Sequence, residues 1–270
     1  MSLEADLVPG ARAISARERR DRIAELVDED QRVRVADLTE RFGVTDASIR
    51  RDLTILEGAG RLRRIHGGAI ARAALLANGV FAMKLRARRE EKVRIAAVAA
   101  RLLRPGQVVL FDSGTTVAQV AAQMPPALRS PNAITAVTHS LPVIEEIGRW
   151  EAPHLICLGG LYLPDYRAFV GPQTIASVRE LAADVIFLGC DGLTVENGLT
   201  TPHVLVAEVG AVAASRARRV IAVADSSKLG RQGFTPIVPL SDVHVLITDV
   251  GADPELVAEI RAVGVEVLLA

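Results

Sequence analysis

Residues 102–270 alternate short apolar runs with amphipathic stretches, and this alternation restricts the fold more than any other feature of the chain. Seven runs are apolar on both faces of an extended chain, which is typical of strands in a parallel sheet: Val108–Phe111, Ile134–Val137, Leu155–Leu158, Val185–Leu188, Val220–Val223, Val243–Ile247 and Val265–Leu269. Most are separated by stretches with apolar residues at helical spacing: Thr116–Gln123, Leu141–Ile147, Thr174–Leu181, Val204–Arg216 and Pro254–Val263. We therefore expect an α/β domain with a mostly parallel sheet covered by helices on both sides.

The first 70 residues show a different pattern, that of three helices and a basic hairpin. Ser15 and Glu18 have the spacing of a capping box at the start of the first helix. A second, short helix is expected over Asp37–Phe42, and after a glycine turn Thr45 is placed to cap a third helix. The basic run that begins at Leu62 ends in a glycine pair, as a strand that turns does. Together these elements predict a winged helix-turn-helix.

The expected boundaries are a winged helix-turn-helix domain over residues 15–70, a linker over 71–92 and the larger α/β domain over 93–270. Charge divides the chain in a similar way. The 32 Lys and Arg balance the 32 Asp and Glu, but residues 1–101 hold 21 basic and 15 acidic residues, whereas the remainder holds 11 and 17. A basic first part and an acidic second part indicate modules with different partners. Overall neutrality therefore excludes nothing about binding to nucleic acid.

Other features point to a cytoplasmic protein. The N-terminus mixes acidic and basic residues, unlike a signal peptide, and no apolar run approaches the roughly 18 residues that span a bilayer. The two cysteines, Cys157 and Cys190, lie in apolar runs and are expected to be buried free thiols.

The residues expected to contact DNA lie on the third helix and on the wing. The third helix buries Ile49, Leu53 and Leu56, so its opposite face is free to enter a major groove. Arginine there can bond a guanine edge bidentately, and arginines on the wing would meet phosphates or a minor groove. The candidate residues are Thr45, Ser48, Arg50, Arg51, Arg61, Arg63, Arg64 and His66. Taken alone, an arginine pair on a helix is more often solvated surface, and it is the whole arrangement that favours DNA binding.

The second candidate site begins with Asp112, Ser113, Gly114, Thr115 and Thr116, between an apolar strand and a helix. Backbone N–H groups and hydroxyls at a helix N-terminus form an anion site, although the same sequence could be a simple cap and turn. It lacks the Gly-Lys-Ser/Thr ending of a P-loop and the spaced glycines of a dinucleotide fold, which favours a small phosphorylated ligand. Further polar residues follow other strands, where open α/β sheets bind ligands: Thr138, His139, Ser140, Asp191 and Lys228, the last being one of only three lysines.

Both halves resemble the DeoR-type family of bacterial transcriptional repressors of sugar metabolism. The N-terminal resemblance rests on Ser48 to Leu53, Leu56-Glu57, Gly60, Leu62, Arg64 and His66 to Ala69, and the C-terminal one on Lys92, Asp112 to Thr116, Gly159-Gly160, Phe187 to Gly189, Gly198 to Thr200, Ala207 to Val209 and Asp225 to Lys228. The C-terminal half of the family is a sensor domain similar to ribose-5-phosphate isomerase, and this resemblance implies a sugar-phosphate ligand. The resemblance places Ser113–Thr116 and Lys228 at the phosphate and Asp191 near the sugar hydroxyls. His139 stands where the family usually has asparagine.

Two other functions compete with this interpretation. An aldose–ketose isomerase needs a carboxylate base, for which Glu208 is a candidate. The isomerase stretch Asp-Gly-Ala-Asp, however, is Asp191-Gly192-Leu193-Thr194 here, without the second carboxylate. A purely architectural DNA binder is disfavoured by the intact phosphate-binding turn and Lys228.

We therefore expect a regulator that is not an enzyme, with no catalytic residue, metal or cofactor. It would act as a repressor of a carbohydrate-metabolism operon whose operator binding is modulated by a phosphorylated sugar. Its expected partners are double-stranded operator DNA and that sugar, without a membrane, and it would act as a homodimer or homotetramer.

Overall fold

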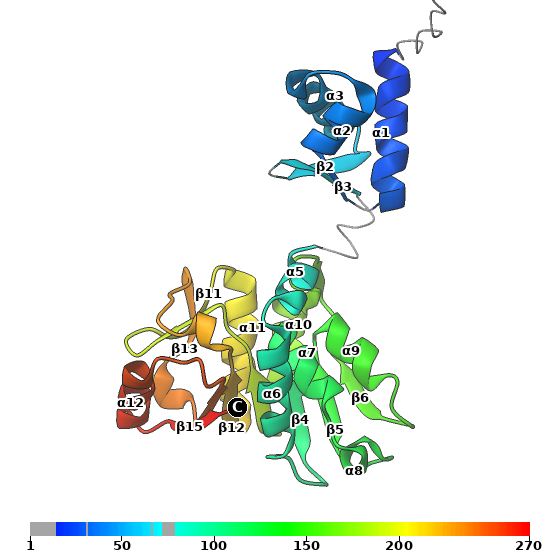
Figure 1. Ribbon diagram of the computed structural model, residues 1–270. Coiled ribbons are helices and arrows are strands. Elements are labelled where there is room, and N and C mark those ends of the chain that lie inside the picture. Colours follow the sequence, from blue (N-terminus) through cyan, green and yellow to red (C-terminus); the bar gives the residue numbers. More distant parts are fainter. Residues whose placement is uncertain (1–14, 31, 66, 72–78) are drawn as a thin grey trace, which may run out of the picture. The chain divides into compact units, whose positions relative to one another are not determined.

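A computed structural model describes residues 15–30, 32–65, 67–71 and 79–270. The chain forms two compact units, Met1–Gly79 and Val80–Ala270, which are considered separately. Figure 1 shows the helical first unit and the layered second unit. No helix of the described residues is both long enough and apolar enough to cross a membrane.

Unit 1 is a winged helix-turn-helix, as predicted. Its elements are α1 (Ala16–Asp30), β1 (Arg32–Arg34), α2 (Val35–Phe42), α3 (Asp46–Gly58), β2 (Leu62–Ile65) and β3 (Gly68–Ala71). The three strands pair antiparallel in the order β1-β3-β2. Three side chains of the core, Ile23, Ile49 and Leu53, are at most 1% exposed. Burial of each such side chain stabilises a fold by roughly 1.5–3 kcal/mol.

Local signals in the sequence explain where these helices begin and end. The backbone N–H of Glu18 donates to Ser15 Oγ at 3.2 Å, and that of Ser48 donates to Thr45 Oγ1 at 3.3 Å, so both expected N-caps are formed. Gly43 ends α2 in the left-handed conformation, with φ of 61°, which glycine adopts without steric cost. The second helix begins at Val35, two residues before the predicted start.

A buried ion pair joins α1 to α3. Arg19 Nε donates to Asp52 Oδ2 at 2.7 Å, and Arg20 lies 3.4 Å from the other carboxylate oxygen. The Asp52 side chain is only 4% exposed, so both arginines compensate for its loss of hydration. The pair fixes α3 against α1 from the side opposite the exposed face of α3.

Unit 2 is built on a seven-stranded sheet whose neighbouring strands all run parallel. In spatial order the strands are β15 (Glu266–Leu269), β14 (Val245–Thr248), β12 (Ala217–Val223), β9 (Ala183–Leu188), β4 (Val108–Phe111), β5 (Thr135–Thr138) and β6 (His154–Cys157). Each corresponds to one of the seven predicted apolar runs, with ends that differ by up to three residues. The predicted α/β fold class is therefore confirmed.

Helices cover both faces of this sheet because successive strand residues alternate between them. Val109 and Phe111 pack with α6 (Arg89–Ala100), α7 (Thr115–Ala122) and α9 (Leu141–Ile147) on one side. Leu110 packs with α10 (Pro172–Arg179), α11 (Val204–Ser215) and α12 (Pro254–Ala262) on the other. Both faces are therefore apolar, as the two-sided runs predicted.

Several short elements lie outside the sequence prediction. Two small antiparallel sheets consist of β7 (Leu161–Leu163) with β8 (Ala168–Val170), and β10 (Gly192–Thr194) with β11 (Gly198–Thr201) and β13 (Thr235–Val238). The remaining elements are α5 (Val80–Arg86), α8 (Pro126–Arg129) and the 3-10 turns η1 (Ser226–Lys228) and η2 (Leu240–Asp242).

The structure differs from the expected linker over 71–92. Residues 72–78 lie outside the described part of the chain, but Val80–Arg86 form α5 and α6 begins at Arg89. Phe81 is 5% exposed and belongs to the core of unit 2. One buried aromatic side chain in an alanine-rich stretch thus attaches this segment to unit 2, which periodicity alone did not reveal.

Candidate functional site

Unit 1 exposes arginine side chains on α3 and on the strand β2 with its preceding turn. Arg50 and Arg51 lie on the face of α3 opposite the buried Ile49 and Leu53. Within the described residues of unit 1, five exposed arginines have no side-chain hydrogen bond or ion pair. Arg51 lies on α3, Arg61 in the turn before β2 and Arg63 on β2, whereas Arg17 and Arg41 lie on α1 and α2. These cations have their full hydrogen-bonding capacity available for an anionic partner.

Other predicted DNA-contacting residues already have partners in the fold. Arg64 Nη1 donates to Thr54 Oγ1 at 2.8 Å, and the Arg64 backbone N–H donates to Glu57 Oε1 at 2.9 Å. Arg64 therefore fixes the wing strand to α3. Arg50 lies 3.5 Å from Asp46 one turn earlier on α3. Thr45 caps the helix and also lies 3.0 Å from Ser48 Oγ, whereas His66 is outside the described residues.

Unit 2 has a cavity where the strand order of its sheet reverses. The chain proceeds from β4 to β5 and β6 on one side, and then returns to β9, β12, β14 and β15 on the other. Open α/β sheets bind ligands outside the carboxyl ends of the strands at such a point. Here the residues that follow β4 and β9, Asp112–Thr116 and Gly189–Asp191, line the cavity together.

The turn after β4 directs backbone amides and hydroxyls to one place. Gly114 has φ of 119°, a conformation that favours glycine, and it precedes the first residue of α7. Gly189 lets the end of β9 approach closely, since a Cβ there would lie 2.9 Å from the carbonyl oxygen of Ser113. Within the described chain, the hydroxyls of Ser113, Thr115 and Thr116 form no hydrogen bond, so the helix N-terminus and three hydroxyls are available to an anion.

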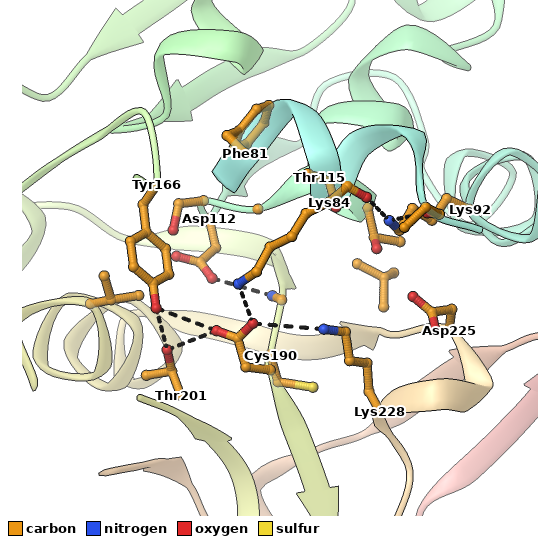
Figure 2. Close-up of a pocket in the computed structure, with 18 of the residues that line it drawn as sticks. Phe81, Lys84, Lys92, Asp112, Thr115, Tyr166, Cys190, Thr201, Asp225 and Lys228 are labelled. Carbon is orange, nitrogen blue, oxygen red and sulfur yellow. Dashed lines mark hydrogen bonds and ion pairs between the residues drawn. The ribbon is translucent and has the colours of Figure 1, made fainter. Parts of the chain in front are cut away.

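All three lysines of the chain line this cavity, although Lys228 is far in sequence from Lys84 and Lys92. Lys84 comes from α5, Lys92 from α6 and Lys228 from η1. Figure 2 shows Lys84 and Lys228 reaching toward the same point from different elements, with Tyr166 and Thr201 beside it. The sequence shows that lysine is rare in this chain, but it does not show that the three lysines lie around one cavity.

Asp191 is the carboxylate that contacts both Lys84 and Lys228. Its Oδ1 accepts from Lys84 Nζ at 2.5 Å and lies 3.7 Å from Lys228 Nζ. Its Oδ2 accepts from Thr201 Oγ1 at 3.1 Å and from the Tyr166 hydroxyl at 3.5 Å. Burial alone would raise the pKa of Asp191, but the hydrogen bond and charge of Lys84, with the charge of Lys228, hold that pKa below its ordinary value.

Lys92 and Arg88 hold the wall of the cavity. Lys92 is buried, and its Nζ donates to the carbonyl oxygens of Lys84 and Ala87, the latter at 2.6 Å. Burial lowers the pKa of Lys92. Arg88 Nη2 donates to Ser226 Oγ at 2.9 Å and lies 3.2 Å from Asp249.

Asp249 in turn orders the turn that carries Lys228. It accepts from the backbone N–H of Ser226 at 2.7 Å and from that of Gly251 at 3.1 Å. Burial by itself would raise the pKa of Asp249, and these hydrogen bonds together with Arg88 lower it. Lys92 therefore fixes the backbone at the end of α5, and Asp249 fixes the turn that carries Lys228. In this way both residues determine the shape of the cavity.

The structure brings together only part of the predicted ligand site. Asp112–Thr116, Asp191 and Lys228 line one cavity. Thr138, His139 and Ser140 are fully buried and do not line it. The reason is that β8 covers the end of β5: Ser140 pairs with Ala168, and His139 Nδ1 donates to the carbonyl oxygen of Phe169 at 2.7 Å.

His139 therefore supports the site from behind. Its Nε2 lies 3.0 Å from Asp112 Oδ1, and the other oxygen of Asp112 accepts from the backbone N–H of Gly189 at 3.2 Å. This arrangement ties the ends of β4, β5 and β9 together. The cavity residues that sequence reasoning did not single out include Phe81, Lys84, Arg88, Asp165, Tyr166, Cys190 and Thr201.

The cysteines differ from the expectation that both are buried. Cys157 is exposed, because β6 is an edge strand. Cys190 is partly exposed at the cavity, and it follows β9 without being part of it. Burial raises the pKa of Cys190 to about 12, so that its thiol stays protonated at neutral pH. Both thiols are free, as expected.

The geometry suits binding better than isomerisation. Lysine ammonium groups and turn amides can hold a phosphate, while a carboxylate flanked by two hydroxyls can accept hydrogen bonds from a polyol. Glu208, the candidate base, is exposed on α11 and does not line the cavity. Of the two carboxylates considered for catalysis, only Asp191 reaches the site.

Comparison with known proteins places both units in one family. Residues 19–73 match the family model described as a DeoR-like helix-turn-helix domain, and residues 87–250 match that of the DeoR C terminal sensor domain. The chain is 36% identical over 251 residues to the HTH-type transcriptional regulator GlpR of Haloferax volcanii, covering 93% of this chain and 96% of that protein. It is 31% identical over 250 residues to the lactose phosphotransferase system repressor of Streptococcus mutans, covering 88% and 94%.

A solved structure of ribose 5-phosphate isomerase A from Methanocaldococcus jannaschii is also similar, with a TM-score of 0.39 and 18% identity. The similarity covers 53% of this chain and 55% of that one.

Proposed function

The chain belongs to the DeoR family of DNA-binding transcriptional regulators, and from that premise we propose that it represses a carbohydrate-metabolism operon under the control of a phosphorylated sugar. The observation that carries the ligand assignment is the convergence of all three lysines on the cavity beside Ser113–Thr116. Its relatives are named as transcriptional regulators and repressors, in agreement with the expectation that the chain is not an enzyme.

In the proposed DNA complex, α3 lies in the major groove. Ser48, Arg50 and Arg51 reach base edges near its N-terminal end, and Arg51 can bond a guanine through two N–H groups because no side-chain partner in the described part of unit 1 occupies it. Arg61 and Arg63 contact phosphates. Arg64 and Thr45 contribute by fixing the wing and the start of α3, which is supported by their contacts within the fold.

In the proposed ligand complex, the phosphate and the sugar occupy different ends of the cavity. The phosphate is bound by the amides and hydroxyls of Ser113–Thr116 and by Lys228, whose ion-pair partner among the described residues, Asp191, lies at 3.7 Å. The sugar hydroxyls donate to Asp191. A ligand that has both groups satisfies the cations and the carboxylate at once, whereas inorganic phosphate leaves Asp191 beside an added negative charge.

A thermal-unfolding screen tests the ligand assignment. Ribose 5-phosphate, fructose 6-phosphate and glucose 6-phosphate are compared with the unphosphorylated sugars and with inorganic phosphate. Because a specific ligand at 100 times its Kd stabilises the folded state by about 2.7 kcal/mol, we expect a phosphorylated sugar to raise Tm clearly more than either control. Equal shifts with inorganic phosphate, or no shift with a wider set of sugar phosphates, would refute the assignment.

We further propose that the protein acts as a homodimer or homotetramer, since two copies of α3 then meet two half-sites one helical turn apart. Light scattering coupled to size-exclusion chromatography measures the mass directly. A monomer that binds its operator at full affinity would contradict this.

A further inference from the structure

The buried pair of His139 and Asp112 lies directly behind the turn that follows β4. The His139 side chain is 0% exposed and that of Asp112 is 4% exposed. Asp112 lines the cavity (Figure 2) and immediately precedes Ser113, the first residue of the turn that binds the phosphate in the proposed ligand complex. The charge of this pair therefore adjoins the phosphate site.

The hydrogen bonds of the imidazole ring determine how many protons the pair holds. His139 Nδ1 lies 2.7 Å from the carbonyl oxygen of Phe169, which can only accept a hydrogen bond, so Nδ1 carries a proton. His139 Nε2 lies 3.0 Å from Asp112 Oδ1. In a neutral ring with its proton on Nδ1, Nε2 has a lone pair, and an ionised carboxylate would face that lone pair with no proton between them. A second proton is therefore needed between His139 and Asp112.

The contacts of Asp112 favour placing this second proton on the imidazole. Asp112 Oδ2 accepts from the backbone N–H of Gly189 at 3.2 Å, and such a hydrogen bond favours the ionised carboxylate. Imidazole is also the more basic of the two groups. With the second proton in place the pair has no net charge, whereas its loss would leave an uncompensated carboxylate in a buried position, which is costly.

The net charge of the pair matters at this place because the proposed ligand is an anion. A carboxylate next to Ser113–Thr116 that lacked a paired cation would repel a phosphate bound to that turn. An imidazolium cancels this repulsion. It also holds the carboxylate in the position from which Asp112 accepts the hydrogen bond of Gly189.

We propose that His139 is an imidazolium ion paired with Asp112, and that it is a positioning residue of the phosphate site, which fixes that carboxylate and cancels its charge beside the phosphate-binding turn. His139 is fully buried and acts through Asp112, which lines the cavity. The role in phosphate binding rests on the proposed function. The charge of the ring does not, so the two are tested separately.

The first test reads the charge of the ring by nuclear magnetic resonance of the full chain labelled with nitrogen-15 histidine. The chain has five histidines, and the signals of His139 are those that disappear in His139→Asn. At neutral pH we expect both ring nitrogens of His139 to carry protons. In Asp112→Asn the new amide can donate to Nε2 while its oxygen accepts from Gly189, so the ring should lose the proton at Nε2. An unprotonated Nε2 in the wild type would overturn the proposal.

The second test measures binding of ribose 5-phosphate, fructose 6-phosphate and glucose 6-phosphate by calorimetric titration at neutral pH. For the sugar phosphate that binds the wild type, His139→Asn should weaken binding at least about fivefold, because Asp112 then keeps an uncancelled charge. Asp112→Asn should bind within about twofold of the wild type, because an amide there needs no cation. The matched control is His154→Asn, which changes an exposed histidine on β6. Thermal unfolding verifies that each variant is folded.

The variant that combines His139→Asn with Asp112→Asn separates charge cancellation from support of the fold. Without the carboxylate there is no charge to cancel, so the double variant should bind more tightly than His139→Asn alone. Equal or weaker binding by the double variant, or unchanged binding by His139→Asn, would overturn the role in phosphate binding. If none of the three sugar phosphates binds the wild type although the ring carries both protons, the proposed function fails and the charge assigned to His139 stands.

Discussion

The two units use their positive charges in opposite ways. Unit 1 presents arginines such as Arg51, Arg61 and Arg63 on its surface without side-chain partners among its described residues. Unit 2 gathers all three lysines around a cavity, where Lys84 and Lys228 face Asp191 and Lys92 is buried against backbone carbonyls. Exposed planar guanidinium groups suit the phosphates and base edges of DNA. Ammonium groups around a cavity suit a small anion, in keeping with the ligand complex that we propose.

The largest expected effect tests the scaffold that presents the surface arginines. Asp52→Ala removes the carboxylate that joins Arg19 and Arg20 across α1 and α3, and we expect the free energy of unfolding of unit 1 to fall by about 3 kcal/mol, since it breaks a largely buried pair. Asp46→Ala is the control, because its pair with Arg50 is exposed and contributes at most about 1 kcal/mol. Chemical denaturation followed by circular dichroism measures both. Equal losses would show that the buried pair is not what holds α3.

The next effect isolates the exposed arginines. Arg51→Ala should weaken operator binding by about 2 kcal/mol, as expected for loss of a bidentate base contact, while the Tm increase caused by a sugar phosphate stays as in the wild type. Anisotropy and thermal unfolding measure the two properties. An unchanged operator affinity would mean that α3 docks differently from the proposal.

The corresponding variant in the cavity should have the reverse effects. Lys228→Ala should weaken binding of the sugar phosphate about tenfold, because a charge-assisted hydrogen bond is lost, and leave operator affinity without ligand unchanged. Arg101→Ala, which removes an exposed cation from unit 2 outside the cavity, serves as the control. Calorimetric titration measures the affinity, and a Lys228→Ala variant with wild-type affinity would remove Lys228 from the site.

The smallest effect is a dependence of stability on pH. The pKa values of Asp191 and Asp249 are held below their ordinary values in the folded protein. Their contribution to stability is therefore fully present above the ordinary carboxyl pKa, and it is lost as pH falls through the lowered values. We expect Tm to fall less steeply with decreasing pH for Asp249→Asn than for the wild type over that range. Parallel curves would show that Asp249 does not contribute in this way.

The central sheet and α3 could be predicted because their signals are local. Runs such as Val108–Phe111 are apolar on both faces, and Thr45 caps α3 as its position indicates. The hairpin of β7 and β8 was not predicted, since it consists of two three-residue strands, and its absence from the prediction led to an error at His139. A polar residue after a strand reaches the ligand only when nothing covers the strand end.

The cavity that the three lysines line could not be predicted from local sequence patterns either. Lys84 and Asp191 are separated by 107 residues, so no local pattern relates them, and Lys84 lies in a segment that resembled a linker. The available signal was compositional: only three lysines occur among 32 basic residues. Residues whose role depends on distant partners, as Lys84, Tyr166 and Thr201 do, need the fold before they can be assigned.

The most direct test of the account is a titration of a phosphorylated sugar into the complex of the wild-type protein with its operator, followed by fluorescence anisotropy. A sugar phosphate that raises Tm should change operator affinity at least about fivefold at saturation, and Lys228→Ala should shift the titration to higher ligand concentration. An operator affinity that stays constant while the sugar phosphate saturates the protein would contradict the claim that the cavity controls DNA binding.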